Sequence, residues 1–290
     1  MSTLRELKGR IGAVSSSEKI TGAMKMISSA KMHKAEMNLG RIVPFRTQIQ
    51  TIMGNLVAAD ADFSSPLTES RNVNSVALVI IGSDDGLCGA YNINLFKDLL
   101  ARINQLKEGN GDVKIKVYPV GKKMLKAASK LKIEGVTVAD TQLESSADSA
   151  KVKEFTFALR DAFVAGEVDK VEIITMKYFS AGKQRLQIYN LLPVAPDAFD
   201  LAADANKPYL FEPNADKIYN SILPLFIISV AQEAFLQNAA SEQAARVMAM
   251  QAANDNAGKL LESLKLEFNK LRQQSITTEL LDILGGQVDR

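Results

Sequence analysis

The chain has 290 residues, of which 47% are hydrophobic and 23% charged, and its formal net charge is +2. This balance excludes a disordered chain, while one cysteine and one histidine exclude an internal disulfide and a zinc site built from paired thiolates or imidazoles. The longest apolar run, residues 222–231, falls well below the roughly 18 residues of a membrane span. With no signal-like or transit-like N-terminus, we expect a cytoplasmic chain of about two domains.

Basic residues gather near the N-terminus. Residues 1–46 contain nine Lys or Arg and three acidic residues, whereas the last fifty residues are slightly acidic. This asymmetry predicts an acidic partner for the N-terminal segment, which could be nucleic acid, anionic lipid or an acidic protein loop. The simpler alternative is a solvated helix face.

Residues 4–57 have the spacing of one long amphipathic helix. Apolar residues recur every three or four positions, and the two clearest rows are Leu4, Leu7, Ile11 and Val14, and Ile42, Phe45, Ile49, Ile52 and Leu56. Pro44 lacks a backbone donor and is expected to bend this helix. At 1.5 Å per residue the helix is roughly 80 Å long.

The middle of the chain changes period and alternates short apolar runs with helical stretches. This alternation predicts a Rossmann-like α/β domain with a mostly parallel sheet. Segments rich in Asp, Ser, Pro and Asn at 60–75 and 193–213 are expected to be its linkers. The expected strands are 76–81, 114–120, 135–139, 171–176 and 185–191, and the expected helices are 94–106, 122–130 and 152–165.

The first strand leads into a glycine-rich turn at 82–89, a place where many α/β proteins bind phosphate. Its glycines do not match G-x-G-x-x-G, and Asp84 and Asp85 would repel an anion. No segment matches the phosphate loop G-x-x-x-x-G-K-[ST] either. Cys88 could be a nucleophile near a helix start, but no base is close in sequence, so we interpret it as a small buried side chain.

Residues 214–284 predict a second long helix with a strict heptad seam. Asn254 is the single polar member of that seam, and such a residue commonly fixes register. Two long amphipathic helices at opposite ends of a chain can bury each other, so we expect an antiparallel coiled coil; the alternative is dimerisation through the C-terminal helix alone. The seam residues are Val247, Met250, Asn254, Ala257, Leu261, Leu264, Phe268 and Leu271.

Four sequence segments together resemble the gamma subunit of F-type ATP synthases. They are Lys19–Met26, Ser83–Gly89, Ala240–Arg246 and Asn269–Thr277, and their order and spacing agree with that family from end to end. The chain departs from the usual family residues at Gly22, Asp85 and Ala90.

The resemblance implies a central rotor shaft that couples a membrane ring to the catalytic beta subunits for ATP synthesis and hydrolysis. It implies a discontinuous coiled-coil domain, 1–59 with 210–286, around an α/β domain at 70–195. The implied partners are the alpha and beta subunits of the catalytic hexamer, the epsilon subunit and the membrane rotor ring. It also implies a non-catalytic, peripheral subunit on the cytoplasmic face of a bacterial inner membrane, with no cofactor and no metal.

Residues that match the motifs of the family take their expected roles from it. Met24, Lys25, Arg246, Gln273 and Thr277 are expected to contact the alpha and beta subunits. The segment Tyr209, Leu210, Phe211 and Glu212 is expected to meet the rotor ring or epsilon.

Two other functions remain as alternatives. One is a coiled-coil protein whose basic N-terminal helix binds nucleic acid, although that helix has no aromatic residue before Phe45 and its basic residues are scattered. The other is a nucleotide-binding α/β enzyme that uses the domain at 70–195.

Overall fold

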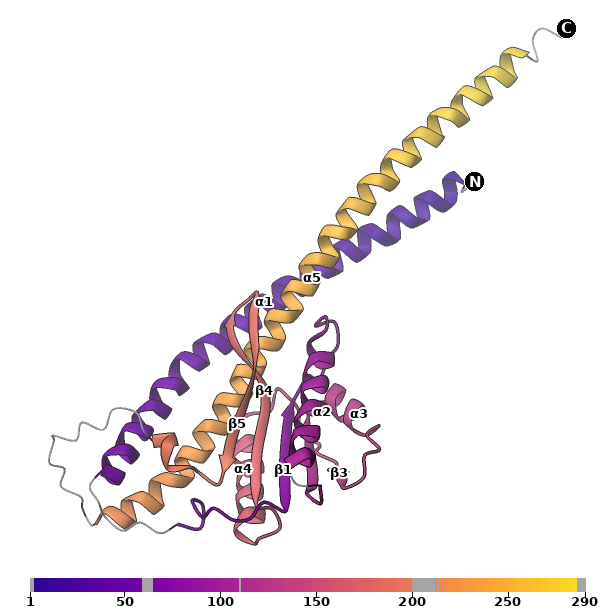
Figure 1. The fold of residues 1–290 in the computed structure, drawn as a ribbon. Helices are drawn as coiled ribbons and strands as arrows, with labels where there is room; N and C mark the ends of the chain where they lie inside the picture. Colours follow the sequence, from indigo (N-terminus) through magenta and orange to yellow (C-terminus); the bar gives the residue numbers. More distant parts are fainter. Residues whose placement is uncertain (1–2, 59–64, 110, 200–211, 213, 286–290) are drawn as a thin grey trace.

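Two helices form a long shaft, and an α/β domain lies beside its lower half (Figure 1). The computed structural model describes residues 3–58, 65–109, 111–199, 212 and 214–285. Helix α1 (Leu4–Ala58) and helix α5 (Ala215–Gly285) run antiparallel, so the two chain ends lie at the same end of the shaft. The predicted pairing of the terminal helices is confirmed, and α1 stays helical through Pro44.

The α/β domain contains a five-stranded sheet with the order β3-β2-β1-β4-β5. Four strands are parallel, and β5 runs antiparallel to β4. A mostly parallel α/β domain is therefore confirmed. The strands are β1 (Ser75–Ile81), β2 (Lys114–Val120), β3 (Val136–Val138), β4 (Lys170–Ser180) and β5 (Lys183–Leu192); the helices are α2 (Tyr91–Gly109), α3 (Lys122–Ala128) and α4 (Ser149–Val164).

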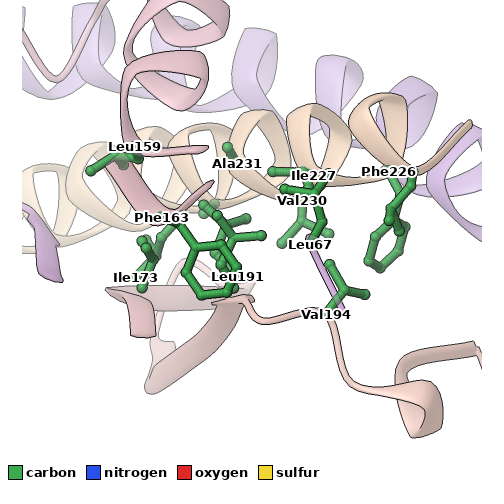
Figure 2. Close-up of a cluster of buried hydrophobic side chains, with 14 of the residues drawn as sticks. Leu67, Leu159, Phe163, Ile173, Leu191, Val194, Phe226, Ile227, Val230 and Ala231 are labelled. Atoms are coloured by element: carbon green, nitrogen blue, oxygen red, sulfur yellow. The ribbon is translucent and has the colours of Figure 1, made fainter. Parts of the chain in front are cut away.

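Apolar layers bury both faces of the sheet. One layer contains Leu95, Leu99 and Ile103 of α2. The other contains residues of α4 and of the first half of α5, and Figure 2 shows Phe163 of α4 beside the strand residue Leu191. Helix α5 contains a window apolar enough to span a membrane by length and composition, but 61% of that window is buried inside the protein, as in a core helix.

The upper shaft is a two-helix coiled coil with a narrow buried seam. All eight predicted seam residues of α5 are buried or half-buried. Leu261 and Leu264 are only 8% and 4% exposed, whereas Leu260 and Leu266 on the outer side are 48% and 67% exposed. Asn254 Nδ2 donates to the Glu18 carbonyl at 2.7 Å, so the polar seam residue contacts the partner helix as expected.

The predicted row at the end of α1 is wrong at two positions. Phe45 and Ile52 are 52% and 37% exposed, whereas Met53 is fully buried and Arg46 takes the neighbouring seam position. A charged residue can occupy this seam because it forms an ion pair with Glu233 of α5. Hydrophobic spacing alone could not reveal that pair.

A short helix lies within the second expected linker. In the described part of 193–213, the one-turn 3-10 helix η1 (Pro196–Phe199) packs against the shaft. The Phe199 ring meets the Phe226 ring of α5 edge to face, with centroids 5.1 Å apart. This contact fixes the lower end of the shaft to the segment that follows β5.

Candidate functional site

The tip of the shaft carries two of the residues expected to meet partners. Gln273 and Thr277 are both exposed, and Thr277 Oγ1 donates to the Gln273 carbonyl at 2.9 Å. They are four residues apart and so lie on one side of α5. Figure 1 shows α5 continuing past the start of α1 in this region. Their contact with another subunit stays a prediction.

Met24 and Arg246 come together although they lie at opposite ends of the sequence. They line one groove of about 340 Å³ between α1, α5 and the glycine-rich turn, and Leu87 and Gln243 line it too. Lys25, the next residue in the sequence after Met24, is half-buried. Gln273 lies 27 residues beyond Arg246 on α5, roughly 40 Å along the helix axis. The expected partner residues therefore form two separate sites.

Arg246 also bonds inside the chain, which the sequence did not indicate. Its side chain is buried, and its Nη2 donates to the carbonyls of Asp85 and Gly86 at 3.3 and 3.1 Å. The same nitrogen donates to Glu242 Oε1 at 2.7 Å. Burial raises the pKa of Glu242, and the charge of Arg246 opposes that rise. Arg246 thus ties the glycine-rich turn to the shaft.

Asp84 in the glycine-rich turn binds the start of α3. Its Oδ1 accepts from the Lys122 backbone N–H at 3.2 Å, and its Oδ2 accepts from the Ser145 and Ser146 hydroxyls at 2.9 and 3.4 Å. The turn packs closely here, because a Cβ on Gly121 would lie 2.8 Å from the Ser83 carbonyl oxygen. The carboxylate of Asp84 thus ties the glycine-rich turn to the start of α3 and to the segment before α4.

Cys88 is a small buried side chain, as interpreted from the sequence. It is 3% exposed, and its Sγ accepts from Asn92 Nδ2 at 3.4 Å. Burial raises the pKa of the Cys88 thiol, so the protonated form is favoured. A protonated, enclosed thiol is a poor nucleophile.

The sequence did not identify the polar residues that fasten α5 to the sheet. Gln237 Oε1 accepts from the Tyr178 N–H at 2.9 Å, and Ser241 Oγ donates to the Met176 carbonyl at 2.9 Å. Asn238 has no exposed surface; it donates to the Gly82 carbonyl at 2.9 Å and accepts from the Tyr91 hydroxyl at 2.8 Å. We call this set the polar clamp; it consists of Gln237, Asn238, Ser241, Glu242 and Arg246.

The signal for the polar clamp is visible in retrospect. Polar residues on a helix whose neighbours are apolar or Ala indicate buried hydrogen bonds rather than solvent. Alanine between these polar residues lets α1 approach closely: Ala240 is fully buried and packs with Ala35 and Leu39 of α1.

A second buried polar group lies lower on the shaft. Arg46 Nε donates to Glu233, and Arg46 Nη1 donates to Gln50 Oε1 at 2.6 Å. Gln50 Nε2 then donates to the Ala198 carbonyl of η1 at 2.8 Å. This chain of bonds joins α1, α5 and the segment after β5 at one level.

The lower end of the shaft holds one of the residues expected to meet the ring. Glu212 is exposed just before α5 begins, at the opposite end of the shaft from Gln273. Tyr209, Leu210 and Phe211 lie outside the described residues. Within the described parts of the chain, no group of three or more His, Cys, Asp or Glu is placed to hold a metal ion.

Comparisons with known proteins agree with this architecture. A family model described as ATP synthase matches residues 3–288. The chain is 37% identical to an ATP synthase gamma chain of Parabacteroides distasonis, covering 99% of this chain and 98% of that one, and 36% identical to one of Bacteroides thetaiotaomicron, covering 99% and 100%.

Solved structures share the fold. A chain of the Euglena gracilis mitochondrial ATP synthase matches with a TM-score of 0.64 at 21% identity, over 98% of this chain and 93% of that one. A chain from the central stalk and ring of the Tetrahymena thermophila mitochondrial enzyme matches with a TM-score of 0.58 at 24% identity, over 81% and 99%.

Proposed function

The chain belongs to the ATP synthase gamma chain family, and we propose that it is the central rotor shaft that couples a membrane ring to the catalytic beta subunits of an F-type enzyme. The observation that carries this proposal is α5, one helix from Ala215 to Gly285 that is core helix of the α/β domain below and half of the coiled coil above. Rotation applied to the lower part therefore reaches the tip through a single element.

The shaft needs to turn as one body. The α/β domain is held to α5 by the polar clamp, whose hydrogen bonds are directional and fix one orientation. The Arg46–Glu233 pair adds a fixed point between the two helices. These contacts support the transfer of torque from the domain to the coil without slip.

The contacts with the hexamer lie at two levels. At the upper level, Gln273 and Thr277 are available to the loops around the tip of the shaft. At the lower level, Met24, Lys25 and the groove at Arg246 contact the beta subunits, and the basic face of α1 would suit an acidic loop of such a partner. Glu212, at the other end of the shaft, serves the rotor ring and epsilon, and the same role is proposed for Tyr209 to Phe211.

The subunit itself does no chemistry in this proposal. Asp84 in the glycine-rich turn adds a negative charge that would repel a phosphate there, which disfavours the nucleotide-binding alternative. The subunit binds no nucleic acid and needs no cofactor. It reaches the membrane only through its partners, on the cytoplasmic face of the bacterial inner membrane. Proton flow through the ring supplies the work.

The experiment replaces Gln273 and Thr277 with Ala in the assembled enzyme. Each hydrogen bond that these side chains make to a surrounding subunit is worth about 1 kcal/mol, so the loss of one such bond should lower turnover roughly fivefold. Gln274→Ala with Thr278→Ala is a matched control, because Thr278 Oγ1 bonds the Gln274 carbonyl at 3.0 Å in the same way, one residue on. Wild-type ATP hydrolysis and synthesis in the first variant, or an equal loss in the second, would refute the role of this site.

A further inference from the structure

The ends of β4 and β5 form an arm that leaves the sheet. Strand β4 pairs with β1 only from Lys170 to Ile174, and beyond that point it pairs only with β5. The Tyr178 hydroxyl donates to Glu36 of α1, and its N–H donates to Gln237 of α5. The arm, residues 175–187, therefore lies across both shaft helices, near the middle of α1 (Figure 1).

Three cations surround one exposed aromatic ring at the end of the arm. Phe179 is 52% exposed and lies at the register shift between Tyr178 and Ser180, where the regular pairing of the two strands is interrupted. Lys177 Nζ, Lys183 Nζ and Arg185 Cζ lie 5.6, 5.9 and 5.8 Å from the centre of the Phe179 ring. We call these four residues the arm tip.

The charges of the arm tip are not balanced. Lys177 and Arg185 are direct cross-strand partners, an arrangement that destabilises a hairpin when the charges are alike. The sequence has no acidic residue from Ile173 to Pro196. Among the described residues, none of the three cations belongs to an ion pair. The described part of the fold thus concentrates positive charge around an apolar ring without pairing that charge to a carboxylate.

We propose that the arm tip is a docking surface for an acidic segment of another protein subunit. Carboxylates of that segment meet Lys177, Lys183 and Arg185, while an aliphatic or aromatic side chain covers the exposed ring of Phe179. This goes beyond the proposed function, which assigns no contact to the arm.

A protein segment fits the arm tip better than other anions do. Single-stranded nucleic acid binds on several stacking rings, and the arm tip presents one. A flat bilayer that approached either end of the shaft would meet the helices first, because the arm crosses the middle of α1. A narrow two-stranded tip instead suits a peptide that can follow its contour.

The test measures binding of the full chain to a labelled peptide that alternates glutamate with leucine. Its controls are the same peptide with glutamine for glutamate and with serine for leucine. The charge variant combines Lys177→Gln, Lys183→Gln and Arg185→Gln. The matched variant removes three exposed lysines elsewhere, Lys123→Gln, Lys126→Gln and Lys130→Gln. Unchanged circular dichroism and melting confirm that each variant is folded.

We expect the charge variant to bind the acidic peptide about tenfold more weakly and the matched variant to bind it like the wild type. Phe179→Ser is expected to weaken binding of the leucine peptide and to leave the serine peptide unaffected. Equal losses in both lysine variants, equal binding of the glutamine peptide, or no wild-type binding below about 1 mM would overturn the proposal. Arm-dependent binding to vesicles of phosphatidylcholine and phosphatidylglycerol, with none to the peptide, would overturn it in favour of a membrane.

Discussion

The lower and upper halves of α5 differ in how they are covered. From Phe226 to Arg246 every side chain is buried or half-buried, because the sheet, α4 and α1 surround the helix. Above Val247 the buried residues of the described part of α5 are all seam residues, and outer residues such as Leu266 are largely exposed. One continuous helix is thus a core element in its lower half and one helix of the coiled coil above, before its end continues past α1. The lower half holds the domain, and the upper half leaves surface free for other subunits.

The two halves also bury different chemistry. The lower half encloses polar side chains, among them Glu233 and Asn238. Glu233 accepts a hydrogen bond from Arg46, and Asn238 donates one to the Gly82 carbonyl. The upper seam is apolar apart from Asn254. Removing a hydrogen-bond or ion-pair partner should therefore lower stability most in the lower half. A polar substitution in the apolar seam should lower it most in the upper half.

The largest expected effect comes from Arg46→Leu in the lower half. This change leaves Glu233, 5% exposed, buried without its cation, which should lower the free energy of unfolding by about 3 to 5 kcal/mol. The double variant Arg46→Leu with Glu233→Leu should recover most of that loss, and Arg41→Leu on the exposed side is the control. Urea unfolding followed by circular dichroism measures all three. A double variant less stable than the single one would contradict the pair.

The next effect is expected from Leu264→Asp in the upper seam. A carboxylate at this 4% exposed position should destabilise the coil by about 3 kcal/mol. Leu266→Asp, two residues away and 67% exposed, should change stability by less than about 0.5 kcal/mol. Hydrogen exchange should speed up above Val247 and stay unchanged in the α/β domain. Similar exchange in both variants would argue against an intramolecular coil.

A smaller effect is expected where the arm meets α1. Burial and the charge of Glu36 raise the pKa of Tyr178 to about 12, so the folded state favours the protonated phenol. Its contribution to stability is full below pH 10 and is lost as the pH rises from 10 to 12. Tyr178→Phe should be less stable at neutral pH by about 1.5 kcal/mol and should lose less stability over that pH range. Parallel pH profiles for the two proteins would contradict the assignment.

The smallest effect compares two helical glycines. A Cβ on Gly12 meets nothing within 4 Å, so Gly12→Ala should raise stability by about 0.8 kcal/mol through helix propensity. A Cβ on Gly54 would lie 2.6 Å from the Phe199 carbonyl oxygen, so Gly54→Ala should lower stability. Thermal melting distinguishes the two signs. A stability change of the same sign in both variants would contradict the difference in space around the two glycines.

The upper coil could be predicted because its stability comes from one periodic feature. The heptad row from Val247 to Leu271 is apolar except for Asn254, so spacing alone locates the buried side. The strands were also recognisable, since short buried strands are apolar runs. The antiparallel direction of β5 could not be recognised, because the spacing of apolar residues is the same in parallel and antiparallel strands.

The lower half could not be predicted in the same way, because its buried positions are not all apolar. Arg46 occupies a seam position that spacing assigned to Phe45, and only its ion pair with Glu233 explains this. Arg246 was expected to face partners, and its bonds to the glycine-rich turn depend on a fold that brings residue 86 to α5. Whether Arg246 also contacts another subunit stays a prediction, as do the roles of Gln273 and Thr277.

The order of the seam contacts along the chain constrains how a cell can make this protein. Glu18 meets Asn254, a residue 236 positions later, so α1 leaves the ribosome long before its partner exists. At about 5 to 20 residues per second, the delay is on the order of ten seconds or more. During that interval the apolar stripe of α1 is uncovered, which makes the nascent N-terminal helix a substrate for chaperones. The α/β domain waits as well, because the first half of α5 covers one face of its sheet, so the domain and the shaft are completed together at the end of synthesis.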